Sequence, residues 1–415
     1  MILVHAADLH LDSPLRGLGG YPGAPVEAVR VATRQACEAL RDLCIERRAS
    51  VLLVAGDLYD GDWRDFSTGL FFRSQMSRLR EAGVRVAVVY GNHDAASVIT
   101  RKLQLPENVK HLSSKKPETI TYEDLGVAVH GRSFPERAVT DDLSRDYPTP
   151  ISGILNFGLL HTCADGHAGH EPYAPCKVDS LRARGYDYWA LGHVHQREVL
   201  SREPWVVFPG NLQGRHVRET GAIGATVIDV EDGRIESVEH VAFDVVRWAE
   251  CAVTMPESST VTDVIDAARA ELSAELDRAE GRVLAARLLV RGPESITGRV
   301  AAEREAVTAE LRAVANDLQG VYFEKLRVEI TSAPRPLASG EWVDALASLG
   351  DMSDEELLAL AEDAVGDFGR KLPSELSRGD GALRLDDPET LRALLREAQQ
   401  AVVVRTRDAT DEDAG

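Results

Sequence analysis

Residues 84–94 read VRVAVVYGNHD, a short apolar run that ends in a cluster of polar residues. The same pattern occurs at residues 2–10, ILVHAADLH, and at residues 51–57, VLLVAGD. Unbroken apolar runs of this length are typical of strands that are buried on both faces. The segments between them, near residues 29–43 and 66–81, are predicted helices. The sequence therefore predicts a βαβαβ beginning and an α/β fold.

Further apolar segments extend this pattern through residue 245, and all of them are predicted strands. They cover residues 153–160, 186–191, 205–208, 222–230 and 235–243. Glu231-Asp232-Gly233 separates the last two, and Asp-Gly favours a tight turn between antiparallel strands. We therefore expect residues 1–245 to form one α/β domain.

A different pattern begins near Val246. Strands are expected at 248–255, 283–291 and 321–330, and helices at 260–279 and 298–318. This order predicts a small α/β cap domain over residues 246–333. Pro334-Arg335-Pro336 then indicates a linker. Residues 334–415 are predicted as a helical C-terminal segment with an acidic tail.

The formal net charge of −20 argues at first against a nucleic-acid substrate. Residues 335–415 contain 9 basic and 19 acidic residues, a net charge of −10, so half of the excess lies near the end of the chain. The remainder still carries −10. Binding of nucleic acid would therefore need a local basic surface, metal ions or a partner protein.

Cellular location is inferred from three features. The five cysteines include no CxxC pair, which favours reduced thiols over a disulfide framework. No apolar run approaches the roughly 18 residues of a membrane span. The opening residues lack the basic start and cleavage site of a signal peptide. We expect a cytoplasmic protein without a membrane segment.

Residues that can bind metal ions stand at the ends of five predicted strands. They are Asp8, His10, Asp57, Asn92, His93, His161, His193 and His195. The carboxyl ends of neighbouring strands converge on one crevice in an open α/β sheet. Residues two apart on an extended backbone point the same way, as in Asp8-x-His10 and His193-x-His195. Each residue alone would be read as a buried histidine or a turn aspartate, but the ordered set predicts a metal site.

The types of ligand indicate which ions fit. Imidazole and carboxylate suit Mn, Fe or Zn better than Mg or Ca alone. Asp8 and Asp57 supply two negative charges, so two divalent cations would leave the site at about +2. A bridging hydroxide and one phosphodiester would neutralise that charge, and such a site stabilises the transition state of phosphate hydrolysis.

The ordered motifs D-x-H, G-D, G-N-H-D, H and G-H-x-H resemble those of the calcineurin-like metallophosphoesterase superfamily. Within it the chain resembles the SbcD nuclease family, in particular its YhaO-type branch. Stretches that carry this resemblance include HAADLHLDSPLRGL, GYDYWALGHVHQRE and FPGNLQGRHVRETG. The resemblance covers residues 1–245 well and the cap only loosely. It implies a four-layer α/β/β/α sandwich.

The resemblance also implies a role for each residue. Asp8, His10 and His195 would hold one metal ion, and Asn92, His161 and His193 the second. Asp57 would bridge both ions. His93 would bind no metal and would protonate the leaving oxygen after attack by a metal-bridging hydroxide. One histidine that binds no metal is also expected on chemical grounds, because an alkoxide is a poor leaving group and departs slowly unless a general acid protonates it. Asp94 either orients His93 or caps the following turn.

Arg215, His216 and Arg218 follow the turn Pro209-Gly210-Asn211 and are candidates for holding a DNA backbone. An ordinary surface or a loop that supports the site is the alternative.

We therefore expect a Mn²⁺-dependent DNA exonuclease or endonuclease, the nuclease subunit of an SbcCD-like repair complex. A small-molecule phosphodiesterase or phosphatase with the same site is the alternative. The C-terminal helices would bind a coiled-coil ATPase of the SbcC type, or else fold back on the cap. A homodimer is left open.

Overall fold

The computed structural model describes residues 1–13, 22, 25–59, 66–96, 104–165, 173–331, 352–371, 387–392 and 394–395. The chain forms two compact units. The first comprises Met1–Glu250, Leu272–Arg287 and Ala315–Glu324, and the second comprises Cys251–Glu271, Leu288–Val314 and Lys325–Gly415. The predicted linker Pro334-Arg335-Pro336 and the acidic tail lie outside the described residues. No described helix is both long enough and apolar enough to cross a membrane.

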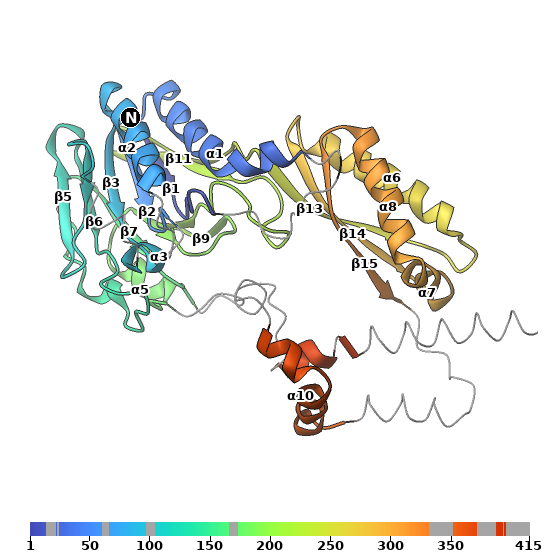
Figure 1. The fold of residues 1–415 in the computed structure, drawn as a ribbon. Coiled ribbons are helices and arrows are strands. Elements are labelled where there is room, and N and C mark those ends of the chain that lie inside the picture. Colours follow the sequence, from blue (N-terminus) through green and yellow to red (C-terminus); the bar gives the residue numbers. More distant parts are fainter. Residues whose placement is uncertain are drawn as a thin grey trace, which may run out of the picture. The chain divides into compact units, whose positions relative to one another are not determined.

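Two six-stranded sheets form the centre of the first unit (Figure 1). The first has the order β12 (Arg234–Ala242), β11 (Gly224–Glu231), β1 (Ile2–Ala6), β2 (Val51–Ala55), β3 (Arg85–Val89) and β4 (Val109–His111). The second has the order β5 (Glu118–Tyr122), β6 (Val127–Gly131), β7 (Leu155–His161), β8 (Tyr188–Gly192), β10 (Trp205–Phe208) and β9 (Glu198–Arg202). β1 to β4 pair in parallel, as do β6, β7, β8 and β10. The carboxyl ends of several strands therefore lie at one edge of each sheet.

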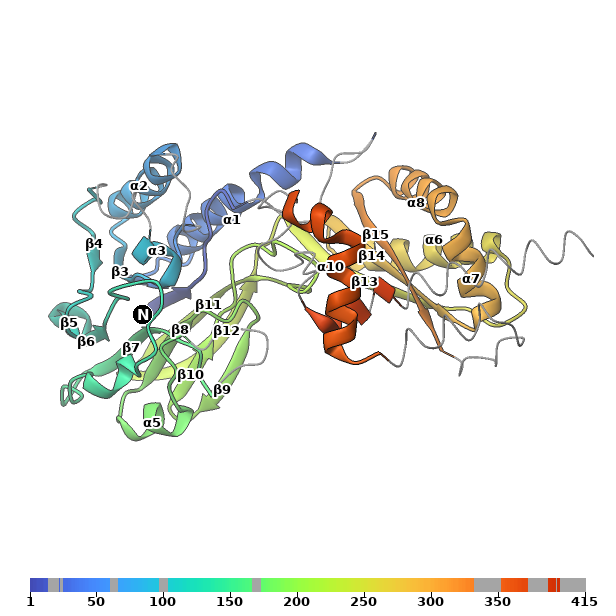
Figure 2. The same ribbon diagram turned by 60° about the horizontal axis from the view of Figure 1, so that its bottom comes forward.

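Helices cover the outer face of each sheet, which gives the predicted four layers (Figure 2). α1 (Val26–Glu46) and α2 (Phe66–Glu81) pack on the first sheet, and α5 (Val178–Ala183) packs on the second. Leu3 of β1 lies in the core between the sheets, whereas its neighbour Val4 lies in the core beneath α1 and α2. Burial on both faces explains why β1 is an unbroken apolar run.

The predicted cap contains a three-stranded sheet of β13 (Val246–Thr254), β14 (Val283–Gly292) and β15 (Val321–Ile330). Its helices are α6 (Val261–Arg278), α7 (Glu294–Ala302) and α8 (Arg304–Leu318). The single helix expected at 298–318 is wrong, because the backbone leaves the helical conformation at Glu303, with φ −97° and ψ 22°. The remaining elements are α3 (Asn92–Ala96), the 3₁₀ helices η1 (Glu123–Leu125) and η2 (Leu143–Asp146), and α10 (Asp354–Lys371).

All five cysteines are buried, and none of them forms a disulfide. Burial raises the pKa of Cys37 to about 12 and that of Cys176 to about 12, so both thiols stay protonated near neutral pH.

Candidate metal centre

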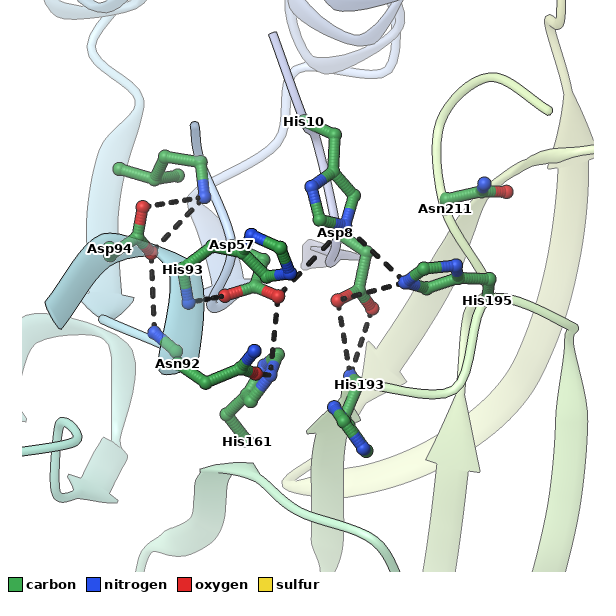
Figure 3. A network of polar contacts seen from close by, with 12 residues as sticks. Asp8, His10, Asp57, Asn92, His93, Asp94, His161, His193, His195 and Asn211 are labelled. Atoms are coloured by element: carbon green, nitrogen blue, oxygen red, sulfur yellow. Dashed lines mark hydrogen bonds and ion pairs between the residues drawn. The ribbon is translucent and has the colours of Figure 1, made fainter. Parts of the chain in front are cut away.

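The polar residues predicted at the strand ends meet at one edge of the two sheets (Figure 3). β1, β2 and β3 of the first sheet lead into one set, and β7 and β8 of the second sheet lead into the other. The residues are Asp8, His10, Asp57, Asn92 and His93 from the first sheet, and His161, His193 and His195 from the second. None of them is fully exposed. The structure thus brings together the complete set that the sequence singled out.

The segments that follow β1 and β2 are hydrogen-bonded to each other at this edge, and their backbone has an unusual conformation. Asp8 N donates to Gly56 O over 3.0 Å, and His10 N donates to Asp57 O over 3.0 Å. Asp8, His10 and Asp57 have φ angles of 51°, 40° and 52°. Residues other than glycine rarely adopt this left-handed conformation. Such strain persists only where the surroundings enforce it, and it is concentrated at functional sites.

Glycines in the motifs permit the close approach of these segments. A Cβ atom at Gly192 would overlap the carbonyl oxygen of Ala55, and one at Gly91 would overlap the Asp57 carboxylate. The glycines therefore bring the backbone of each motif against its neighbour, which a larger residue would prevent.

One group of ligand atoms belongs to Asp8, His10 and His195, and these atoms all lie within 4.8 Å of one another. His10 Nε2 faces His195 Nε2 at 3.3 Å, and His195 Nε2 lies 4.0 Å from Asp8 Oδ1. His10 Nδ1 is buried and has no hydrogen-bond partner among the described residues. This group contains the three residues expected to hold the first metal ion.

A second group belongs to Asp8, Asp57 and His161. His161 Nε2 lies 2.9 Å from Asn92 Oδ1 and 3.5 Å from Asp57 Oδ2, while its Nδ1 lies 2.9 Å from Ala55 O. A carbonyl oxygen can only accept a hydrogen bond, so Nδ1 carries the ring proton. In the neutral ring, Nε2 then presents its lone pair towards two oxygen atoms.

His93 and His193 are placed differently from the other histidines. His93 N donates to Asp57 Oδ1 over 3.0 Å, and the His93 ring forms a third group with His10 and Asp57. His193 N donates to Asp8 Oδ2 over 2.9 Å. The His193 ring belongs to none of the three groups found in the described residues, and its centroid lies 5.2 Å from that of His161.

Burial and mutual repulsion perturb the titration of these side chains. Burial raises the pKa of Asp8, and the facing Asp57 carboxylate raises it further. Burial also raises the pKa of Asp57, but the imidazoles of His161, His93 and His193 outweigh it and leave that pKa below its ordinary value. Burial lowers the pKa values of His10 and His161. The imidazoles of His10 and His161 are therefore neutral near pH 7, which is the form that binds metal ions.

This donor set fits two divalent cations. Two buried carboxylates face each other, and the lone pair of His161 Nε2 points at the oxygens of Asn92 and Asp57. Cations among these atoms would turn repulsive contacts into favourable ones. The mixture of imidazole, carboxylate and amide oxygen suits Mn, Fe or Zn.

The Asp94 carboxylate is bound by backbone N–H groups of residues that precede it in the chain. Its carboxylate accepts hydrogen bonds from Leu58 N at 3.0 Å, Tyr59 N at 3.2 Å and Gly91 N at 3.2 Å. Burial, followed by repulsion from Asp57, raises its pKa to about 7. Asp94 therefore caps the loops after β2 and β3, and these contacts supply no orienting bond to the His93 ring.

The three candidate DNA contacts lie in the loop between β10 and β11. The side chains of Arg215 and His216 turn towards Glu219, with Arg215 Nη2 at 3.4 Å and His216 Nε2 at 3.4 Å from Glu219 Oε1. Arg218 is exposed. Arg215 also lies close enough to affect the pKa values of Asp8 and His10. The loop thus lies beside the site and brings positive charge to it.

Sequence reasoning missed Glu219 and Asn211. Glu219 Oε1 lies 2.7 Å from His195 Nδ1, and Asn211 Nδ2 donates to Glu219 Oε2 over 2.8 Å. The available signal was chemical, because a histidine that binds metal usually donates its second ring N–H to a carboxylate or carbonyl. By this rule a carboxylate or carbonyl is expected near His195. Glu219, which follows the turn at Gly210-Asn211, is an acidic residue that can meet this expectation.

Comparison with known proteins places the chain in a family. Residues 1–197 match the calcineurin-like phosphoesterase family, and residues 248–331 match the middle domain of the metallophosphoesterase YhaO. YhaO of Bacillus subtilis is 35% identical over 296 residues, which cover 70% of this chain and 72% of YhaO. The chain belongs to the YhaO family of calcineurin-like metallophosphoesterases. It is therefore a phosphoester hydrolase, and the calcineurin-like family works with two divalent metal ions.

Relatives outside the YhaO family are more distant. The DNA double-strand break repair protein Mre11 of Methanopyrus kandleri is 30% identical over 294 residues, which cover 60% of this chain and 61% of that protein. Mre11 of Sulfurisphaera tokodaii is 27% identical over 222 residues, covering 50% of this chain and 55% of that protein. The chain thus spans somewhat more than half of the length of these two proteins.

Proposed function

We propose that the chain is a two-metal DNA nuclease of the SbcD type that hydrolyses phosphodiester bonds. The observation that carries this proposal is that the three groups of nitrogen and oxygen ligand atoms share residues and so form one cluster at the strand ends. His93 belongs to this cluster through His10 and Asp57. The similarity to two Mre11 proteins supports DNA as the substrate.

Each side chain has a proposed task. Asp8, His10 and His195 would hold one cation, Asn92, His161 and His193 would hold the second, and Asp57 would contribute to both. When bound, two such cations supply positive charge to the phosphate and lower the pKa of the attacking water. Asp8 and Asp57 alone carry the negative charge of these ligands, so the loaded site keeps a net positive charge for the substrate.

His93 is proposed to donate a proton to the leaving oxygen. Its backbone N–H is held by Asp57, which fixes the start of α3 against the site. The His93 ring meets the His10 ring edge-on, with centroids 5.0 Å apart. The imidazole therefore lies beside the ligands, where a leaving group of a bound phosphodiester would be within its reach.

Arg215, His216 and Arg218 are proposed to contact the phosphate backbone of the substrate. Glu219 holds Arg215 and His216 near the ligands, while Arg218 lies on the surface. Lysine and arginine contacts to phosphate position nucleic acid without reading its sequence.

Cleavage of DNA is expected to require a divalent cation and to be strongest with Mn²⁺. The test incubates the pure chain with linear duplex, single-stranded and hairpin DNA in Mn²⁺, Mg²⁺ or excess chelator. A small diester, bis(p-nitrophenyl) phosphate, is assayed in parallel. Full activity in chelator after exhaustive dialysis would contradict the two-metal mechanism. Activity on the small diester with none on any DNA would contradict the nuclease and favour a small-molecule phosphodiesterase.

The C-terminal segment is proposed to bind a coiled-coil ATPase of the SbcC type, with domain boundaries near residues 245 and 333. Leu357 of α10 and Leu391 are buried, and Arg392 Nη2 donates to Asp354 Oδ1 over 2.7 Å. These contacts join α10 to the helical residues 388–392. Leu360 and Leu394 are each 38% exposed and offer an apolar surface. The stripe of Trp342, Val343, Leu346 and Leu349 lies outside the described residues.

The double variant Leu360→Asp, Leu394→Asp is expected to lose co-purification with the ATPase and to keep cleavage of bis(p-nitrophenyl) phosphate. A charged side chain in a buried apolar interface costs several kcal/mol. Leu70→Asp is the matched control, because Leu70 is an exposed leucine of α2. Unchanged binding of the double variant would contradict the docking role. Sizing of the pure chain in the same buffer reports whether two copies associate.

A further inference from the structure

Glu219 is a buried carboxylate at the border of the metal centre, and only 6% of it is exposed. Its Oε2 accepts from Asn211 Nδ2 at 2.8 Å and from Arg215 N at 2.6 Å. Its Oε1 lies 2.7 Å from His195 Nδ1, with Arg215 Nη2 at 3.4 Å and His216 Nε2 at 3.4 Å. Amide and guanidinium N–H groups only donate, so Glu219 is surrounded by donors and serves as the acceptor for all of them.

Among the described residues, two neighbours compete for His195 Nδ1. Glu219 Oε1 lies at 2.7 Å and requires a proton on that nitrogen, whereas Arg215 Nη2 lies at 3.0 Å and requires a lone pair there. The contact to the carboxylate is the shorter one, and Arg215 already has Glu219 as an acceptor. The ring therefore carries its proton on Nδ1 and keeps the lone pair on Nε2.

The Nε2 atom of His195 is the one that faces the ligands. It lies 3.3 Å from His10 Nε2 and 4.0 Å from Asp8 Oδ1. We propose that Glu219 is a positioning residue that fixes the Nδ1–H tautomer of His195 and so keeps Nε2 available to a divalent cation beside Asp8 and His10. This inference rests on the proposed two-metal function and deepens it. In this proposal Glu219 acts on the cation through His195 Nδ1.

The substitution Glu219→Gln reverses the tautomer. A glutamine has one acceptor oxygen, and the Oε2 position has two donors to satisfy, Asn211 Nδ2 and Arg215 N. The amide oxygen is expected to take that position, which turns the amide NH₂ towards His195. His195 Nδ1 then faces two donors, the amide and Arg215, and must accept. Its proton moves to Nε2 and must leave that atom before the atom can bind a cation.

The tautomer is measured by NMR on the metal-free chain labelled with ¹⁵N-histidine, and the His195 signals are assigned by their loss in His195→Gln. The wild type is expected to show Nδ1–H and Glu219→Gln to show Nε2–H. Glu219→Asp keeps a carboxylate and is expected to retain Nδ1–H. Glu324→Gln is the matched control, because the side chain of Glu324 is 7% exposed and accepts two hydrogen bonds from Arg287. An Nε2–H tautomer in the wild type, or Nδ1–H in Glu219→Gln, would overturn the proposal.

Calorimetric titration with Mn²⁺ gives the second measurement. Loss of such an outer partner typically weakens metal affinity by about 10–100-fold, so Glu219→Gln is expected to show that loss. Glu219→Asp should lie between it and the wild type, and Glu324→Gln should match the wild type. Equal affinity in wild type and Glu219→Gln would overturn the positioning role. If the wild type bound no Mn²⁺, the two-metal function would be overturned instead. The NMR measurement of the His195 tautomer would still test the role of Glu219, because it uses the metal-free chain. If Glu219→Gln fails to fold, the wild-type tautomer and Glu219→Asp decide the question.

Discussion

His93→Ala is expected to lower DNA cleavage by about 10²–10⁴-fold while both metal ions stay bound. The imidazole is proposed to protonate a leaving alkoxide, which departs slowly without that proton. The link between His93 and Asp57 uses the backbone N–H, at 3.0 Å from Asp57 Oδ1, so alanine preserves it. The substitution therefore removes the acid and leaves the fixed start of α3 in place.

Two measurements separate this role from a metal-binding one. Cleavage of bis(p-nitrophenyl) phosphate should be largely spared, because nitrophenolate leaves readily without protonation. Metal content should equal that of the wild type. His111→Ala is the control, since His111 is an exposed histidine of β4. An empty metal site in His93→Ala would show that His93 acts as a ligand, as its grouping with His10 and Asp57 would also permit.

The central strands could be predicted from sequence because both of their faces are buried. Val51–Ala55, Trp205–Phe208 and Val321–Ile330 have the bounds that the apolar runs indicated. The run at 2–7 is one residue longer than β1, and the run at 84–90 is one residue longer than β3 at each end. The hairpin of β11 and β12 followed from Asp232 and Gly233, which have φ angles of 47° and 73°. In these segments the structure that the local sequence favours is also the structure that packing in the folded protein requires.

Two strands at the ends of the second sheet escaped prediction because their local pattern is weak. β5, Glu118–Tyr122, is mostly exposed at one end of the second sheet, and β9, Glu198–Arg202, is only half-buried at the other. An edge strand needs no continuous apolar run, since one of its sides meets solvent. The break at Glu303 was missed because α7 and α8 carry similar helix-forming residues on both sides of it.

The proposed metal ligands could be predicted from the sequence more readily than the residues that hold them in place. Asp8, Asp57, Asn92 and His161 stand at strand ends, where topology alone brings them together. Glu219 depends instead on a loop whose path brings a residue 24 positions away back to His195 Nδ1. Long-range contacts of this kind leave no periodicity in the sequence. Arg215 was singled out as a candidate for contact with a DNA backbone, but its bond to Glu219 is visible only in three dimensions.

Asp57→Asn is expected to abolish tight binding of both metal ions and to reduce DNA cleavage to the level of the wild type in chelator. Asparagine has the same shape, and its oxygen can still accept from His93 N. Only the negative charge proposed to lie between the cations is lost. Metal analysis and melting curves with and without Mn²⁺ test this. A cation at about 1,000 times its Kd stabilises the folded state by about 4.1 kcal/mol, so the wild type should melt higher with Mn²⁺ and the variant should not.

Asp94→Asn is the matched control for the loss of a buried charge. Asp57 and Asp94 are each 1% exposed, but the Asp94 carboxylate is occupied by backbone N–H groups of Leu58, Tyr59 and Gly91. Asp94→Asn should therefore lose about 1–3 kcal/mol of stability in chelator, because an amide satisfies fewer of these donors. It should keep the rise in melting temperature that Mn²⁺ causes. If Asp57→Asn kept that rise and Asp94→Asn lost it, the bridging carboxylate would have to be assigned to Asp94 in place of Asp57.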